Sequence, residues 1–149
     1  MRLRRTIGFL TLFALLAFLP ATLAPGKTPR PVKFSAALNI GQEVPHPKGT
    51  KAGASGRFTA TVTGTTLTWR LTFTHLSGPA TAAHIHRGAR GVSGPVVVPL
   101  CGPCTSPASG TANVTQADLK DMLARKMYVN VHTARNPNGE IRGQITRAL

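Results

Sequence analysis

Three histidines in the second half of the chain have the spacing of metal ligands. His84 and His86 stand two residues apart, and His132 ends the stretch Tyr128–His132. Both stretches alternate apolar and polar residues, so each is predicted to be a β-strand in which every second side chain shares a face. His84 and His86 then point the same way, and His132 can join them from another strand. Because neutral imidazole is a ligand of copper and zinc, the pattern predicts a Cu(II) or Zn(II) site.

The same histidines also fit a purely structural role as a hydrogen-bonded polar patch. The polar face around them comprises Tyr128, Asn130, Glu140, Arg142 and Gln144. The imidazoles can bond to the backbone, to Asn130 or to Glu140. The register of the last hairpin is open, so His132 faces either Glu140 or Arg142, and a cationic Arg142 beside the three rings would oppose a metal. Both interpretations remain open at the level of sequence.

Two cysteines form a second motif, Cys101-Gly-Pro-Cys104, which copies the redox motif of thioredoxins. That chemistry needs the motif to open a helix in a βαβ unit. Here Pro107 follows closely and no βαβ pattern surrounds the motif. The prediction is a local disulfide between Cys101 and Cys104 that pins a loop in an exported protein. A thiol–disulfide redox protein is the alternative.

The chain has few residues that could form other kinds of catalytic site. The chain has only four acids, Glu43, Asp118, Asp121 and Glu140. We find no Ser-His-Asp arrangement and no carboxylate pair for acid–base work, so a hydrolase is disfavoured. Of the two further histidines, His75 is predicted to be buried at the end of a core strand, and His46 to be solvated in a loop. An enzyme is therefore the less favoured interpretation.

Alternation with period two recurs through the elements that must position these residues. Residues 58–63 and 67–74 alternate around a Gly64–Thr65 turn, which predicts a β-hairpin with Trp69 at the centre of the core. Similar short runs separated by turns indicate seven or eight strands. One helix is predicted at about Gln116–Ala124, with Thr115 as its N-cap. The expected fold is all-β: an antiparallel Greek-key β-sandwich or barrel with one short helix.

The first residues have the composition of a cleaved leader. Arg2, Arg4 and Arg5 precede an apolar run of 13 residues, Ile7–Leu19, which is short for a bilayer span of about 20. We predict a signal peptide over residues 1–24, a flexible linker over 25–32 and one domain over 33–149. An uncleaved anchor is the alternative. The expected location is secreted, periplasmic or in the cell envelope, with no transmembrane helix after cleavage.

The remaining chain is strongly basic. Loss of the leader removes three arginines and no acid, which takes the net charge from +14 to +11. Such a charge attracts acidic surfaces, so anionic envelope components, or another extracellular protein, are the expected partners. Nucleic acid is a poor candidate, because the basic residues are scattered and aromatic residues for base stacking are few.

Several of these motifs together resemble the CHRD domain, which is named for chordin and occurs in bacterial secreted proteins. The likeness rests on Ala83–His86, on Gly94–Leu100, and on Tyr128–Thr133 with Asn136–Ile145, and it extends over about Phe34–Ile145. It implies a β-sandwich and an extracellular setting, and little about activity. The sequence therefore favours an exported binding or structural module without assigned catalysis. The alternative is a copper- or zinc-binding, or copper-dependent redox, protein.

A weaker, local likeness concerns the strand that carries His84 and His86. It is similar to the copper-site strand of Cu/Zn superoxide dismutases. The likeness is incomplete, because that chemistry uses four copper histidines and usually a zinc site with an aspartate. Only His46 and His75 remain here as further candidates.

Overall fold

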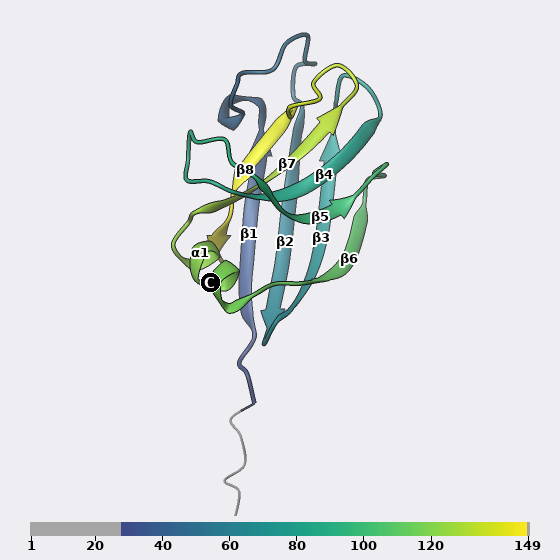
Figure 1. Cartoon of the computed structure of the whole chain (residues 1–149). Helices are drawn as coiled ribbons and strands as arrows, with labels where there is room; N and C mark the ends of the chain where they lie inside the picture. The colour runs from purple at the N-terminus through teal and green to yellow at the C-terminus, as the bar shows by residue number, and fades with distance from the viewer. Residues whose placement is uncertain (1–27, 149) are drawn as a thin grey trace, which may run out of the picture.

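A computed structural model describes residues 28–148 of the chain (Figure 1). The predicted signal peptide, residues 1–24, lies outside the described residues, as does the start of the predicted linker. Residues 28–31 carry no regular structure, and the first strand begins at Val32, one residue before the predicted start of the domain.

Within residues 28–148, nine strands and two short helical segments follow one another along the chain. They are β1 (Val32–Asn39), the 3₁₀ turn η1 (Ile40–Gln42), β2 (Ser55–Thr63), β3 (Thr66–Thr74), β4 (Ala80–Arg87), β5 (Val96–Cys101), β6 (Ala108–Asn113), α1 (Gln116–Leu123), β7 (Met127–Thr133), β8 (Ile141–Gln144) and β9 (Thr146–Arg147).

The strands form one antiparallel sheet that curls into a nearly closed barrel. Their order is β5-β4-β7-β8-β1-β2-β3-β6, and β9 adds to β1. The chain crosses over between β3 and β4, between β5 and β6, and again through α1 to β7. These crossovers bring β5 and β6, the two ends of the sheet, into contact. In Figure 1, β4 and β5 pass in front of β1, β2 and β3. The predicted all-β class is confirmed.

The core is filled by alternate residues of the strands, as the period of two predicted. In the β2–β3 hairpin, Phe58 pairs with Leu71 and Ala60 pairs with Trp69, and all four are buried. Trp69 is 5% exposed, so its predicted place in the core is correct. Threonines and arginines occupy the alternate positions of the same strands and face outward.

The predicted helix is present, with its predicted cap. The Thr115 hydroxyl accepts a hydrogen bond from the Asp118 backbone N–H, and the Asp118 carboxylate accepts one from the Thr115 N–H. This reciprocal pair satisfies two donors that the first turn leaves free. The helix lies at one end of the barrel (Figure 1). It has eight residues, and no helix within residues 28–148 has the length to cross a bilayer.

His75 departs from its predicted burial. It is exposed, with φ of 56°, and follows the last residue of β3. The alternation that places Leu71 inward holds only while the backbone stays extended. After Thr74 the chain turns, and the His75 ring lies beside the Thr74 hydroxyl, with Nδ1 and Oγ1 3.0 Å apart. His46 is exposed in its loop.

Candidate metal centre

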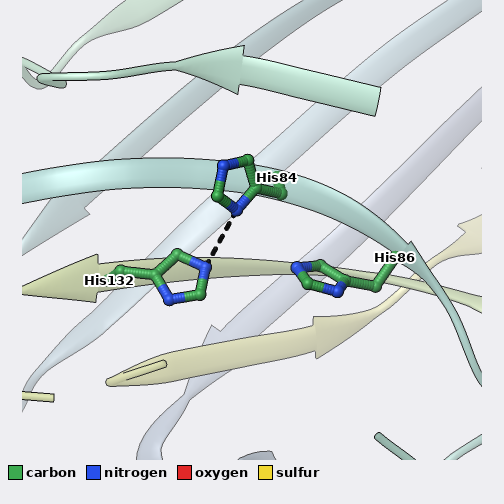
Figure 2. A group of neighbouring side chains, drawn as sticks. All are labelled: His84, His86 and His132. Carbon is green, nitrogen blue, oxygen red and sulfur yellow. Dashed lines mark hydrogen bonds between the residues drawn. The ribbon is translucent and has the colours of Figure 1, made fainter. Parts of the chain in front are cut away.

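The three histidines of the sequence motif come from two neighbouring strands. Strands β4 and β7 are antiparallel, with Ala82 opposite His132 and His84 opposite Asn130. His132 is therefore the diagonal neighbour of His84 on the shared face. The His84 Nδ1 atom lies 3.0 Å from the His132 Nε2 atom, and one ring nitrogen from each of the three residues lies within 4.8 Å of the others (Figure 2).

Two of the rings are oriented by backbone carbonyls. The Nδ1 atom of His132 is 2.9 Å from the Pro137 oxygen, and that of His86 is 2.9 Å from the Gly94 oxygen. A carbonyl only accepts, so each Nδ1 carries the proton and each Nε2 keeps the lone pair. Figure 2 shows the far nitrogen of His86 directed at the other two rings. Metal-binding histidines are held in this way, with the second nitrogen donating to a carbonyl.

His84 has the opposite tautomer in this arrangement. Because the His132 Nε2 carries no proton, the His84 Nδ1 must donate the hydrogen bond that joins the two rings. Two lone pairs would otherwise face one another at 3.0 Å. If His84 ligates an ion through Nδ1, its proton moves to Nε2 first. A metal ion would thus replace the proton shared between His84 and His132.

The surroundings keep all three imidazoles neutral at pH 7. Burial lowers the pKa of His84 and of His86 from the usual 6.5. Burial, together with the charges that His84 and His86 would carry, lowers the pKa of His132 to about 4. The buried His86 Nε2 has no hydrogen-bond partner. A buried lone pair without a donor is costly unless something binds it.

The donor set fits a transition metal with an open position. An ion held at about 2.0–2.1 Å by tetrahedral nitrogens separates them by about 3.3 Å, close to the 3.0 Å between His84 and His132. The nitrogens of the three residues lie within 4.8 Å of one another, so the third must move closer for one ion to bind all three. Within residues 28–148, no further histidine, cysteine or carboxylate joins the group. Three neutral donors therefore leave a fourth position free, and the site departs from the four-histidine copper pattern of the dismutases.

Arg142 does not face His132. It lies opposite Asn130, and its guanidinium carbon is 3.4 Å from the centre of the Tyr128 ring. Its Nη2 donates to the carbonyls of Ala89 and Val92, at 2.9 and 3.0 Å. The stack on Tyr128 and these two carbonyls fix the cation, whose charge still acts to lower the pKa of His86.

Glu140 is likewise occupied away from the histidines. Its carboxylate accepts hydrogen bonds from the Ser77 backbone and hydroxyl, from the Thr133 hydroxyl and from the Asn136 amide. Burial acts to raise the pKa of Glu140, but these four bonds outweigh it and lower that pKa. Glu140 therefore holds the β7–β8 turn together, and with it the Pro137 carbonyl that orients His132.

Most of the polar face is buried, with His84 and Gln144 half-buried, a feature that the sequence did not reveal. All seven residues of β7 are buried, on both faces of the strand. The loop of residues 88–95 folds over them: Gly94 donates to the Tyr128 hydroxyl, and Gln144 donates to the Gly88 carbonyl. A Cβ on Gly94 would collide with the Arg87 carbonyl, so only glycine allows the loop to lie this close.

Glu43 is the residue near the site that the motifs missed. It is buried just after η1, next to Asn130, and burial raises its pKa to about 7. Its Oε2 atom lies 2.5 Å from the place that a Cβ on Gly139 would take, and Gly139 has φ of 128°. No pattern in the sequence marks this contact, because Glu43 and Gly139 are almost 100 residues apart and meet only in the folded chain.

The cysteines are joined as predicted. Cys101 and Cys104 form a disulfide at the end of β5, and the Cys104 N–H donates to the Ala80 carbonyl of β4. The motif sits in a strand-to-strand loop and opens no helix, so it lacks the setting that lowers a thioredoxin thiol pKa.

Comparison with known proteins gives one family. The family model described as the CHRD domain matches residues 34–145, three quarters of the chain. The histidine pair, the covering loop and the β7–β8 hairpin all lie within this range. No curated protein and no solved structure matches the chain.

Proposed function

The chain belongs to the CHRD domain family, and from this premise we propose that it is an exported binding module that holds Cu(II) or Zn(II) on His84, His86 and His132. The family supports a binding or structural role and names no reaction. The observation that carries the metal is the convergence of three imidazole nitrogens, two of them with their lone pairs fixed inward by carbonyls.

Copper is the ion that the donors favour. Affinity for nitrogen ligands rises along the first-row divalent ions to Cu(II) and falls at Zn(II). Three neutral rings and no carboxylate leave the whole charge of the ion uncompensated, so the fourth position would hold water or a small anion. In the bound state the His84 proton lies on Nε2, and the Gly94 and Pro137 carbonyls keep His86 and His132 in place.

Export is the second part of the proposal. A disulfide persists outside the reducing cytosol, and Cys101 and Cys104 are paired. We propose that residues 1–24, in which arginines precede the apolar run, are the signal peptide that directs export. Mass spectrometry of the protein secreted by its host tests this: a mature N-terminus at Pro25 supports export, and a cell-retained chain that begins at Met1 contradicts it.

A titration with two matched double variants tests the metal. Wild type is compared with His84→Ala/His86→Ala and with His46→Ala/His75→Ala, which removes two exposed histidines outside the cluster. We expect wild type and the control to bind one Cu(II) each, with nitrogen hyperfine structure in EPR, and the first variant to lose at least 100-fold in affinity. The single variant His86→Gln removes one ligand with a smaller change of the side chain, so its loss of copper would not be explained by misfolding of the double variant. Equal copper in all three proteins would refute the site.

A further inference from the structure

One outward sheet face carries cations and hydroxyls and no acid. Phe34, Phe58 and Leu71 of strands β1, β2 and β3 point into the core, so the alternate residues point out. We call this outer surface the Thr–Arg face; it comprises Lys33, Ser35, Arg57, Thr59, Thr61, Thr68, Arg70 and Thr72. Lys33, Arg57 and Arg70 are exposed.

The strand register sets the spacing of the three cations. Arg57 is opposite Thr72 and Arg70 is opposite Thr59, so the two arginines are diagonal neighbours about 7–8 Å apart. Lys33 is opposite Thr61, which places it about 12–14 Å from either arginine along the sheet. Between them the surface is hollowed, with a volume of about 340 Å³.

Within residues 28–148, no acidic side chain lies on this face. Asp118 and Asp121 are paired with Arg87, and Glu43 and Glu140 are buried beside β7. These are all the acids that the chain contains. The positive potential of the Thr–Arg face is therefore free to act on a ligand.

We propose that the Thr–Arg face binds an acidic polysaccharide, with carboxylate or sulfate groups on Arg57, Arg70 and Lys33. Guanidinium forks pair with such groups through two parallel hydrogen bonds. The threonine hydroxyls between the cations both donate and accept, which matches the hydroxyls of a sugar chain. A polymer presents both kinds of group repeatedly, as the face does.

Other polyanions fit this surface less well. Single-stranded nucleic acid needs exposed aromatic rings for stacking, and Trp69 of β3 points inward. Anionic bilayers and protein interfaces need exposed apolar anchors. The large apolar side chains exposed within residues 28–148 are Val92, Val96 and Leu123, none of them on this face.

Matched charge variants test the assignment in metal-free protein. Binding to dextran sulfate and to polygalacturonate is measured at 50 mM salt for wild type, Arg57→Gln/Arg70→Gln and Arg90→Gln/Lys120→Gln. The last variant loses the same charge from exposed positions outside the face. We expect the first variant to bind about ten-fold more weakly with a shallower salt dependence, and the control to change less than about two-fold.

The same experiment contains its refutations. Equal losses in the two variants would mean that only net charge matters, which overturns the face as a site. Neutral dextran bound as tightly as dextran sulfate would do the same. Stronger binding to phosphatidylglycerol vesicles than to either polysaccharide would assign the face to a membrane instead. Thermal melts check that both variants are folded, which the outward side chains lead us to expect.

Discussion

The chemistry of single residues at this site depends on which of their polar atoms have hydrogen-bond partners. His86 and His132 each donate a hydrogen bond from Nδ1 to a backbone carbonyl and direct Nε2 at the other rings. The two carbonyls therefore fix the tautomers of these residues. Glu43 keeps one buried oxygen without a partner, and so does Asn130. Burial without full pairing favours the neutral form of a carboxyl, which is why the pKa of Glu43 is raised to about 7.

Substitution of Glu43 by glutamine should change how stability depends on pH. Between the unfolded pKa of 4.5 and the folded pKa of about 7, the folded protein holds the extra proton, so Glu43 makes stability fall as pH rises. Glu43→Gln removes this contribution. The unfolding free energy of the variant minus that of wild type should therefore increase by about 2–3 kcal/mol from pH 4.5 to pH 8.

Urea unfolding followed by the fluorescence of Trp69 measures this gain in metal-free protein. The variant Glu43→Asp, which keeps a carboxyl, is the control and should retain a pH dependence of the same sign. A constant difference between wild type and Glu43→Gln across the range would contradict the raised pKa.

At the scale of elements, the loop between β4 and β5 links the fold to the site. Residues 88–95 supply the carbonyls that fix Arg142, and the Gly94 carbonyl that fixes His86. The Ser93 hydroxyl ties the loop to the Val44 carbonyl after η1. The loop therefore covers the polar side chains of Arg142 and His86, which lie between it and the barrel.

Replacement of Gly94 by alanine should displace this loop from the barrel. The added Cβ meets the Arg87 backbone, which cannot rotate aside, so the loop must shift and His86 loses its carbonyl. We expect a loss of about 2–4 kcal/mol in stability and a 10- to 100-fold loss in copper affinity.

Gly78→Ala is the matched control, because Gly78 lies in another loop where a Cβ would meet nothing within 4 Å. It should stay within about 0.5 kcal/mol of wild type and keep its copper affinity. Calorimetry and copper titration give both quantities. Wild-type affinity in Gly94→Ala would show that the loop does not hold His86 for the metal.

For the whole molecule, metal binding, protonation and folding are linked. The lowered pKa of His132, about 4 against 6.5, means that the unfolded chain binds more protons between these values. The stability contributed by neutral His132 is fully present above pH 6.5 and is lost as pH falls towards 4. Glu43 acts in the opposite direction over much of the same range, so the metal-free protein should show a shallow pH profile.

Added Zn(II) should raise the melting temperature well below the usual pKa of histidine. At 100 times its dissociation constant, an ion that binds only the folded state adds about 2.7 kcal/mol. Because folded His132 stays neutral until about pH 4, and burial also lowers the pKa of His84 and of His86, the shift should persist at pH 5.5 and disappear near pH 4. Scanning calorimetry over this range provides the measurement. A shift that is already lost at pH 6 would point to exposed histidines, and His46→Ala/His75→Ala would then abolish it.

The sequence by itself determined most of the strands, the helix cap and the shared face of His84 and His86. Alternation of apolar and polar residues is a local property, and the family resemblance drew on the same motifs. It also placed Trp69 in the core, because Leu67 and Leu71 share its phase. His75 was the error, since nothing in the alternation tells where an extended backbone ends.

Only the tertiary structure decided that β4 lies beside β7, that Arg142 faces Asn130 and that the polar face is covered. These depend on contacts between residues from 12 positions apart, as for Arg142 and Asn130, to 53 positions apart, as for Arg142 and Ala89, and the strand period carries no information about them. The distance between imidazoles, the inward lone pairs and the unneutralised Thr–Arg face are consequences of strand order and register. The local pattern supplied the ligand types, and the pairing of β4 with β7 brought them together.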